Sequence, residues 1–283
     1  SRDNSGRRAF YRLSVLCPFL LRDRDPKVFL RRLLRSQICG VRPLKDICFG
    51  QASDVALDLP VKAACESAWR EWVEVRGAVQ ALPPRIGHFG WMRCDDPSAV
   101  ADLKHLVVNR GRPLLLLQKH TVTLPRNGIR FMSTPAVQMV MQTRPDVPDM
   151  DGISTLQSHD AEEMLQLAKI CKPGPFEIGT HLLGTFLGLR ERGKLVAMAG
   201  QRSRFSGWVE ISGVCVHPDL RGGGRGSELM RAMVHLILAG GAKPFLHTYR
   251  ENHQAISLYE RLGFTIRSDM QMISIDVADE ATS

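Results

Sequence analysis

Residues 214–227 read Val-Cys-Val-His-Pro-Asp-Leu-Arg-Gly-Gly-Gly-Arg-Gly-Ser, and this stretch decides the fold. The apolar residues of 208–216 predict a strand, and the apolar spacing of 227–239 predicts a helix beyond a glycine-rich turn. Glycines let a backbone approach a ligand closely, and the first N–H groups of a helix point outward without partners. The helix dipole and the charges of Arg221 and Arg225 add positive potential at the same place. The stretch therefore predicts a binding site for a diphosphate group.

Two nucleotide-binding motifs are excluded by particular residues. A Walker A loop has a lysine followed by serine or threonine after its last glycine, and residues 214–227 contain no lysine. A dinucleotide-binding fingerprint that used Gly222 and Gly224 would need its third glycine at the position of Ser227. The expected diphosphate therefore belongs to another kind of ligand.

Two motifs resemble the coenzyme-binding segments of the GNAT superfamily of N-acetyltransferases. Residues 221–226 read Arg-x-x-Gly-x-Gly directly after a strand ending in Val-x-Val-x-Pro, which resembles the family's acetyl-CoA pyrophosphate loop. Residues 252–264 read Asn-x-x-Ala-x-x-x-Tyr-x-x-x-Gly-Phe, which resembles its second coenzyme-side segment. Both motifs occur in the family's order, and the resemblance covers about residues 155–276.

The resemblance implies an α/β fold, an α+β sandwich in which helices flank a mixed central sheet. It also implies an enzyme that uses acetyl-CoA as co-substrate, needs no metal, and lets a neutral amine attack the acetyl thioester directly. Such a reaction removes a proton from an ammonium group, stabilises an oxyanion, and returns a proton to the departing thiolate.

Coenzyme-binding roles follow from the same resemblance. Backbone groups of 214–216 would bind the pantetheine arm, the amides of 222–227 would hold the diphosphate, and Asn252 and Ala255 would face the arm. The implied residues are Val214, Cys215, Val216, Arg221, Gly222, Gly223, Gly224, Arg225, Gly226, Ser227, Asn252 and Ala255. The alternative is that 222–224 is only a flexible turn and that Asn252 is only a helix cap.

Three side chains are candidates for acid–base catalysis. Tyr259 matches the family's general acid, which protonates the coenzyme sulfur; the alternative is a tyrosine that only packs on its helix. Glu210 is the candidate base, acting directly or through water, although a salt-bridged strand glutamate is the alternative. His247 is a second candidate base. Cys215 has apolar neighbours, so we expect a core thiol and no covalent acyl carrier.

Turn and capping signals divide the GNAT-like part into elements. Asp160 and Glu163 have the spacing of a capping box at the start of a helix. The expected elements are a helix at 160–171, a hairpin of 184–190 and 194–201 around Gly193, a strand at 208–216, a helix at 227–239, a strand at 244–248, a helix between Asn252 and Gly263, and strands at 264–266 and 270–275.

The chain as a whole is expected to have five parts. They are a basic N-terminal segment at 1–66, a smaller N-terminal α/β region at 67–142, a linker at 143–157, the GNAT domain at 158–277 and a tail at 278–283. Within 67–142 we expect a helix near 99–106, strands at 114–117 and 137–141, and a turn at 123–127. This region resembles the degenerate N-terminal half of two-domain family members, including glycine N-acyltransferase-like proteins.

Positive charge is concentrated at the start of the chain. Ten basic and three acidic side chains in residues 1–36 supply +7 of the formal net charge of +9, which leaves +2 for residues 37–283. Residues 1–36 are interpreted as a solvated basic arm, a transit-like segment, or sequence upstream of the protein proper. Because the remainder is close to neutral, the charge argues against nucleic-acid binding as the main function.

Seven cysteines are scattered through the chain without a CxxC pair. Their odd number and irregular spacing predict reduced thiols in a cytoplasmic protein, with no disulfide framework and no zinc site. The apolar runs are far shorter than the roughly 18 residues of a membrane span, so we expect no membrane association.

Three function classes remain in order of preference. The first is an N-acyltransferase that acetylates a primary amine of a small molecule or peptide, the second a non-catalytic acyl-CoA-binding sensor, and the third a nucleic-acid-binding protein. The segments 172–180 and 202–207 contain no diagnostic carboxylate cluster, so the acceptor stays open. The sequence predicts no oligomeric state.

Overall fold

The computed structural model describes residues 54–93, 98–120 and 129–277, which fall within one compact unit. The expectations for 1–53, for the turn at 123–127 and for the tail at 278–283 lie outside the described residues.

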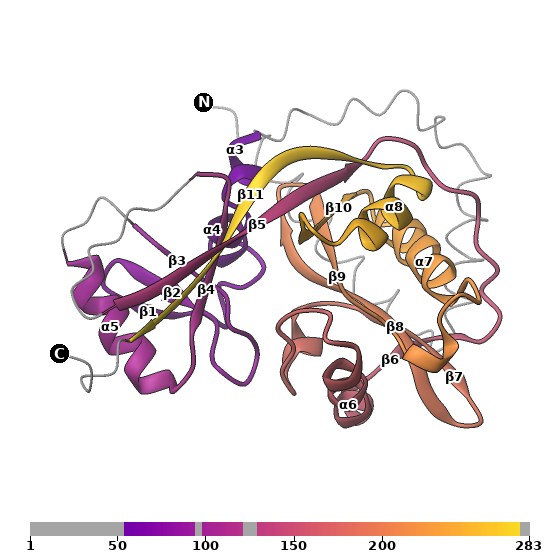
Figure 1. The fold of residues 1–283 in the computed structure, drawn as a ribbon, viewed down its shortest axis with the longest axis horizontal. Coiled ribbons are helices and arrows are strands. Elements are labelled where there is room, and N and C mark those ends of the chain that lie inside the picture. The colour runs from indigo at the N-terminus through magenta and orange to yellow at the C-terminus, as the bar shows by residue number, and fades with distance from the viewer. Residues whose placement is uncertain (1–53, 94–97, 121–128, 278–283) are drawn as a thin grey trace, which may run out of the picture. The chain divides into compact units, whose positions relative to one another are not determined.

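A small N-terminal assembly precedes the main sheet (Figure 1). Its elements are α3 (Asp54–Asp58), α4 (Pro60–Cys65), β1 (Glu74–Arg76), β2 (Val79–Ala81), β3 (Gly90–Met92) and α5 (Ala99–Arg110). The three strands form an antiparallel sheet in the order β1-β2-β3. Residues 54–65 were expected in the basic segment, yet they form two helices whose Leu57, Val61 and Ala64 are buried.

Eight strands form the main sheet in the order β4-β11-β5-β10-β9-β8-β7-β6. Their bounds are β4 (Leu114–Gln118), β5 (Ile129–Met141), β6 (Ile153–Leu156), β7 (Phe186–Glu191), β8 (Lys194–Phe205), β9 (Trp208–Val216), β10 (Lys243–Tyr249) and β11 (Phe264–Val277). The helices are α6 (Ala161–Cys171), α7 (Arg225–Ala239) and α8 (His253–Arg261), with short 3-10 turns η2 (Ser158–Asp160), η3 (Thr180–Leu183) and η4 (Pro218–Leu220). Among the described strand pairs of this sheet only β9 and β10 are parallel, so the expected mixed α/β sheet flanked by helices is confirmed.

Three local expectations differ from the structure. The two closing strands form one strand, β11, because a bulge between Ile266 and Ser268 absorbs the polar interruption. Part of the expected linker forms β6. The carboxylate of Asp160 does not cap α6, since it accepts a hydrogen bond from the Gln157 amide at 2.7 Å and another from Arg190 at 2.6 Å.

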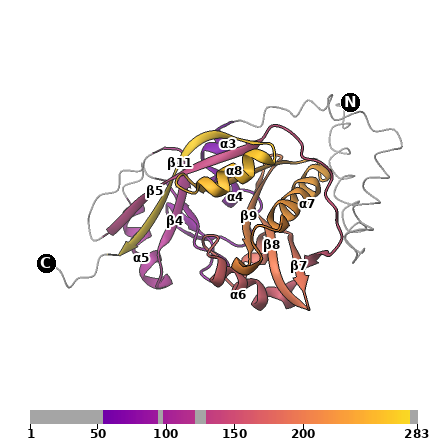
Figure 2. The same ribbon diagram turned by 45° about the vertical axis from the view of Figure 1, so that its right-hand side comes forward.

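Strand β5 lies between β10 and β11, although it precedes them by about a hundred residues in the chain (Figures 1 and 2). It pairs antiparallel with β11 from Met141 opposite Phe264 to Ile129 opposite Val277. It also pairs antiparallel with β10. The sheet is therefore continuous across 143–157, and a strand from the N-terminal region completes the GNAT-like part.

The two faces of the sheet have separate cores, as the alternation of side chains along a strand requires. Leu246 of β10 packs with α7, whose Met230 and Met233 are fully buried. Its neighbour Phe245 points to the opposite face, where it packs with α3 and α4. Burial of each such side chain is worth about 1.5–3 kcal/mol. On that opposite face, farther along the sheet, α6 covers Met198 and Cys215.

Strands β9 and β10 pair only over part of their length. Their parallel register ends at Leu246 opposite Ile211, and β10 then continues along β5 alone. On β9 a bulge follows, with Gly213 at φ +63° and a register shift opposite Met198 and Gly200. The two strands diverge at their carboxyl ends, which is where ligands bind in α/β sheets.

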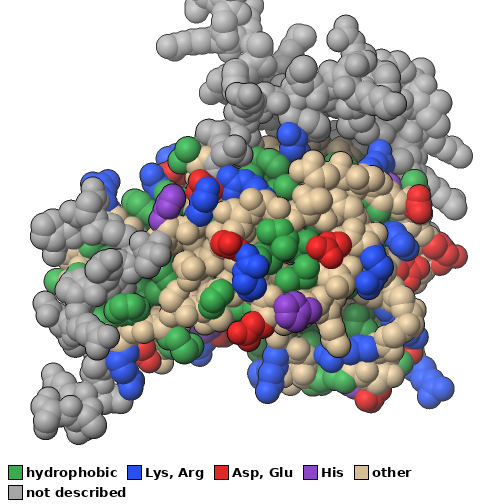
Figure 3. Space-filling view, turned by 45° about the horizontal axis from the view of Figure 1, so that its top comes forward, with side chains coloured by type: hydrophobic (Ala, Val, Ile, Leu, Met, Phe, Trp, Pro, Cys, Tyr) green, Lys and Arg blue, Asp and Glu red, His purple; other side chains and the backbone are tan. Residues whose placement is uncertain are grey.

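Basic and acidic side chains are interspersed on the face shown in Figure 3, with hydrophobic side chains between them. None of the helices formed by the described residues is long and apolar enough to cross a membrane.

Candidate active site

A cavity of about 600 Å³ lies between the diverging ends of β9 and β10 and is bounded by α7, α8 and the end of α6. It brings together eleven of the residues singled out for coenzyme binding or acid catalysis. These are Val214, Val216, Arg221, Gly222, Gly224, Arg225, Gly226, Ser227, Asn252, Ala255 and Tyr259. Cys215, Gly223 and Glu210 do not line the cavity.

The glycine-rich loop ends at Gly224, which is the N-cap of α7 in the left-handed conformation. No side chain caps the helix, and the first helical hydrogen bond runs from the Glu228 amide to the Gly224 carbonyl. A Cβ on Gly222 or Gly224, both at positive φ, would meet no atom within 4 Å. Unpaired amides beside open space fit an anion such as a diphosphate.

The two arginines of the loop differ in their surroundings. The guanidinium of Arg225 forms an ion pair with Glu191 at the end of β7 and also donates to the Leu220 carbonyl at 3.3 Å. Arg221 donates from Nε to the Val216 carbonyl at 3.3 Å and is exposed. The charge of Arg225 is thus partly offset, so the loop offers Arg221 and the helix amides as its strongest positive groups.

The segment 214–216 forms one wall of the cavity. Val214 and Val216 line it, whereas the Cys215 side chain points to the other face of the sheet and packs beneath α6. Cys215 is 1% exposed, as expected for a core thiol. Any contact of this residue with a ligand would be made by its backbone.

Helix α8 forms the opposite wall. Asn252 accepts a hydrogen bond from the Ala255 amide at 3.1 Å, so its side chain is a helix cap, and both residues also line the cavity. Tyr259 is 9% exposed, and burial raises the pKa of its hydroxyl to about 12, with a smaller contribution from Cys215. The phenol is therefore protonated near neutral pH and can donate a hydrogen bond into the cavity.

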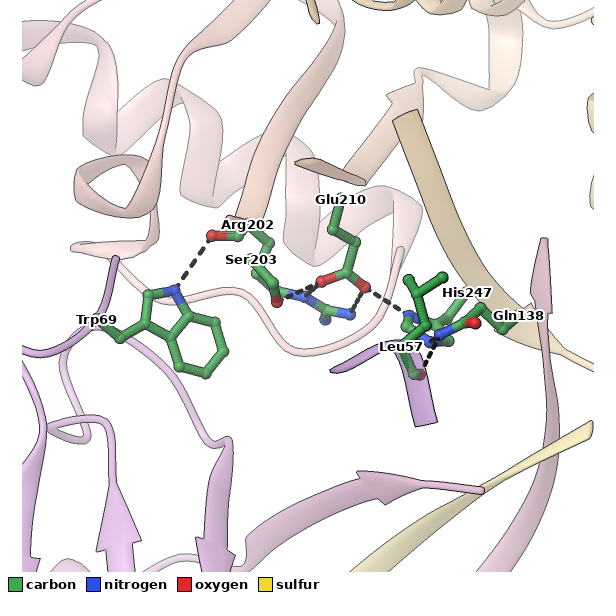
Figure 4. A network of polar contacts seen from close by, with 7 residues as sticks. All are labelled: Leu57, Trp69, Gln138, Arg202, Ser203, Glu210 and His247. Atoms are coloured by element: carbon green, nitrogen blue, oxygen red, sulfur yellow. Dashed lines mark hydrogen bonds and ion pairs between the residues drawn. The ribbon is translucent and has the colours of Figure 1, made fainter. Parts of the chain in front are cut away.

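Glu210 lies behind the cavity and is fully engaged by three side chains (Figure 4). Its Oε2 accepts hydrogen bonds from Arg202 Nε at 3.0 Å and from Ser203 Oγ at 2.6 Å. Its Oε1 forms an ion pair with Arg202 and lies 2.7 Å from Nδ1 of His247. Burial raises the pKa of this carboxyl, but the charge of Arg202 and the hydrogen bonds from His247 and Arg202 outweigh burial and hold it well below its usual range.

A carboxylate with so low a pKa binds a proton weakly and has no direct access to the cavity. Its geometry suits a different task, which is to hold Arg202 and His247 in place. These two residues do line the cavity, at the end away from the glycine-rich loop. The face of Phe89 lies 4.2 Å from the Arg202 guanidinium and fixes it further.

The hydrogen bonds around Gln138 assign the proton of His247. Arg267 donates to the Gln138 Oε1 at 2.9 Å, and the Gln138 Nε2 donates to the Leu57 carbonyl at 2.7 Å. The same amide nitrogen lies 3.0 Å from Nε2 of His247, so that ring nitrogen accepts. The network therefore assigns a neutral imidazole that donates from Nδ1 to Glu210.

Sequence reasoning missed several residues of this site. Gln138 stands among apolar residues of a strand, and a buried polar side chain on a strand is the one signal that could have marked it. Arg202 stands in the polar run 201–204 of β8, which gave no such contrast. Cys171 lines the cavity as well, and so does 172–175, which the sequence marked as a helix end and as part of the segment 172–180 considered for the acceptor pocket. Among the described residues no group of three or more His, Cys, Asp or Glu could hold a metal ion.

Comparisons with known proteins agree with this geometry. Residues 155–264 match the family model described as the acetyltransferase (GNAT) family. A crystal structure from Novosphingobium aromaticivorans, described as an acetyltransferase of the GNAT family, is 33% identical with a TM-score of 0.71 and covers 79% of this chain and 99% of its own. No curated protein matches.

More distant structures share the fold alone. A GCN5-related N-acetyltransferase from Kribbella flavida is 16% identical with a TM-score of 0.54, and the match covers 77% of this chain and 95% of that one. A GCN5-related N-acetyltransferase-like protein from Streptococcus suis is 15% identical with a TM-score of 0.50, covering 87% of this chain and 98% of its own.

Proposed function

Because the chain belongs to the GNAT acetyltransferase family, we propose that it transfers an acetyl group from acetyl-CoA to a primary amine of a small molecule or peptide. The single observation that carries this proposal is the cavity between β9 and β10, with an uncapped helix at one end and a protonated tyrosine in its wall.

Acetyl-CoA would enter with its diphosphate on the glycine-rich loop. The amides of 222–227 and Arg221 supply the donors, and a negative group at a helix N-terminus gains about 0.3–1 kcal/mol from the dipole alone. The pantetheine arm would lie along 214–216, where β9 has lost β10 as a neighbour and its backbone groups face the cavity. Ala255 leaves room for the arm on the side of α8.

Tyr259 would act when the thioester breaks. The amine attacks the acetyl carbonyl, the tetrahedral intermediate collapses, and the carbon–sulfur bond breaks with its electron pair on sulfur. The neutral Tyr259 hydroxyl donates a hydrogen bond to that sulfur and delivers the proton as negative charge builds up. The surroundings that disfavour a charged phenolate also disfavour a bare thiolate, so the hydrogen bond from Tyr259 stabilises the departing sulfur.

His247 would accept the proton of the incoming ammonium, directly or through a water. Its Nε2 carries the lone pair, which accepts from the Gln138 amide in this structure, so that amide must turn away from the ring before Nε2 takes up a proton. Glu210 would serve as a positioning residue, because its carboxylate accepts from Nδ1 and stabilises the imidazolium that forms. In this proposal Glu210, the candidate base from the sequence, acts through His247, the second candidate.

The acceptor would approach between β5, β11 and the end of β10. Ala136 of β5 and Met272 of β11 line the cavity there together with Tyr249. The N-terminal region therefore contributes to the acceptor side, while the loop and α8 form the coenzyme side.

A thiol-release assay with acetyl-CoA and a panel of primary amines tests this proposal, with calorimetry of CoA binding on the same protein. We expect CoA binding, release of free thiol with at least one amine, and loss of release but not of binding in Tyr259→Phe. Ser268→Ala is the control, since it removes a hydroxyl that does not line the cavity. Binding without release across the whole panel would instead establish the sensor, and absence of binding would overturn both functions.

A further inference from the structure

Two cysteines meet where α6 ends against β9. Cys171 is the last residue of α6, and Lys172 follows it in the left-handed conformation at φ +51°. The chain then turns into the segment 172–175, which lines the cavity together with Cys171. The half-buried thiol of Cys171 donates to the Val216 carbonyl at 3.3 Å.

Cys215 precedes Val216 on β9, and its side chain lies on the face of the sheet that α6 covers. Its side chain lies in the core beneath α6, in contact with Met164 and Leu167, and Cys171 packs against the same cluster. Both cysteines belong to the same packed cluster, and the carbonyl that accepts from the Cys171 thiol is that of Val216, the residue next to Cys215. One sulfur thus faces the cavity and the other is buried directly behind it.

The surroundings shift the pKa values of the two thiols in opposite directions. The hydrogen bond from Cys215 is the largest cause that lowers the pKa of Cys171, burial opposes it, and the charge and hydrogen bond of Arg221 and the charge of His217 lower the pKa further, to about 6. The hydrogen bond to Cys171 and burial raise the pKa of Cys215. Near neutral pH the pair therefore consists of an accessible thiolate and a buried thiol, the arrangement of a reactive cysteine with a resolving partner.

We propose that Cys171 is a site of oxidation by peroxides, that Cys215 resolves the product as a Cys171–Cys215 disulfide, and that this bond weakens binding at the coenzyme end of the cavity. The first two statements rest on the positions of the two thiols. The third rests also on the proposed function, because it requires coenzyme A as the ligand.

The chemistry balances with a peroxide as oxidant. The Cys171 thiolate attacks one peroxide oxygen, the O–O bond breaks, and the leaving hydroxide or alkoxide takes up a proton, which leaves a sulfenic acid on Cys171. The Cys215 sulfur then attacks the Cys171 sulfur, the S–O bond breaks, and water leaves with the Cys215 proton. The cysteine pair loses two electrons and the peroxide gains two. A dithiol reductant restores both thiols by exchange.

The disulfide would act on the wall that holds the pantetheine arm. It ties the end of α6 and the segment 172–175 to β9, and it removes the donor to the Val216 carbonyl. A diphosphate beside Arg221 would in turn draw that guanidinium away from Cys171 and make the thiolate less stable. Coupling between two sites is reciprocal. If bound CoA slows the oxidation of Cys171, then the Cys171–Cys215 disulfide must lower the affinity for CoA.

The test uses the full chain with hydrogen peroxide, followed by blocking of free thiols and mapping of linked peptides by mass spectrometry. We expect a Cys171–Cys215 link that forms at least fivefold more slowly with saturating CoA, and alkylation of Cys171 by iodoacetamide that is half-maximal near pH 6. The Kd for CoA should rise about tenfold on oxidation and return with dithiothreitol. Cys215→Ser should stop at a sulfenic acid that dimedone traps.

Cys65→Ser is the matched control, because Cys65 is buried in the N-terminal core away from the cavity and burial raises its pKa to about 12. It should oxidise and lose CoA affinity as the parent does, whereas Cys171→Ser and Cys171→Ala should keep the same Kd before and after peroxide. A Cys171 that stays reduced, or that links to another cysteine, overturns the oxidation site. A disulfide without a change in Kd overturns the regulatory consequence, and a chain that binds no CoA in either state overturns the proposed function while the mapped disulfide stands.

Discussion

Glu210 and His247 lie on the two strands that diverge around the cavity, and Nδ1 of the imidazole is 2.7 Å from Oε1 of the carboxylate. Both side chains are almost wholly buried, at 1% and 3% exposed. The contact spans the last part of the sheet where β9 and β10 are still neighbours, so the fold itself sets the orientation of the ring that faces the acceptor end. Several expectations depend on this pair and on the loop beyond it.

Replacement of Glu210 by glutamine should destabilise the protein. Arg202 would keep a buried charge without its partner, and loss of one member of a buried ion pair commonly costs about 3–5 kcal/mol. Because the folded pKa of Glu210 is depressed, its stabilisation is present above its unfolded pKa of about 4.3 and is lost as the pH falls through the folded pKa. The difference between variant and parent, measured by urea unfolding, should therefore be full at pH 7 and shrink below about pH 4.

Glu163→Gln is the control for that experiment. Its carboxylate also pairs with an arginine, and its pKa is also lowered, chiefly by the hydrogen bond from Arg190, but its side chain is 44% exposed. Exposed pairs contribute about 0–1 kcal/mol, so this variant should unfold close to the parent. Equal losses for both variants would contradict a special role of the buried network.

Tyr259→Phe should lower kcat by about 10²- to 10⁴-fold and leave the Kd for CoA within twofold. The protonated phenol is the active form, and its pKa of about 12 means that Tyr259 causes no loss of activity below about pH 11. The kcat of the parent, followed from pH 6 to pH 10, should show no alkaline fall from this group. An unchanged kcat in the variant would remove Tyr259 from the mechanism.

Gly224→Ala should impair coenzyme binding through the backbone. Position 224 has φ +79°, where a side chain costs roughly 1–2 kcal/mol, and the strain falls on the amides that begin α7. We expect about a tenfold higher Kd for CoA by calorimetry. Gly193→Ala is the control, since Gly193 has φ +80° and open space in the β7–β8 turn, so it should lose similar stability and keep its affinity.

Removal of residues 1–142 should prevent folding of the remainder. Without β5 the sheet has no strand between β10 and β11, and both would expose unpaired backbone and apolar side chains such as Phe245 and Phe264. We expect aggregation, or a product without a cooperative unfolding transition by circular dichroism. Co-expression with residues 1–142 should restore soluble material, and a cooperatively folded 143–283 fragment would contradict the dependence on β5.

The elements on the coenzyme side could be predicted from the sequence because their signals are local. Proline and glycine mark the ends of β9 and α7, and Asn252 and Gly263 bound α8 as its cap and its left-handed terminator. The sequence therefore places these elements well where each depends on its own neighbours, and their assignment as a binding site stays a prediction. The individual roles of these residues stay proposals.

The acceptor side could not be predicted because its contacts join distant parts of the chain. No local pattern says that β5 inserts between β10 and β11, and without that insertion Gln138 has no relation to His247. The sequence left open whether Glu210 is a base, acting directly or through water, or a salt-bridged strand glutamate, because only the fold shows Arg202 and Ser203 around its carboxylate. The helices α3 and α4 are too short to give a periodic signal.

The position of β5 between β10 and β11 also affects how the chain folds during synthesis. The ribosome synthesises β5 well before β10 and β11, so neither sheet neighbour exists when β5 emerges. Ile129 can pair with Val277 only after Val277 has been added to the chain. Closing so large a loop is slow compared with forming helices. We expect the nascent chain to hold an apolar strand without its sheet neighbours until β10 and β11 have been synthesised, so its yield should depend on chaperones that cover this strand.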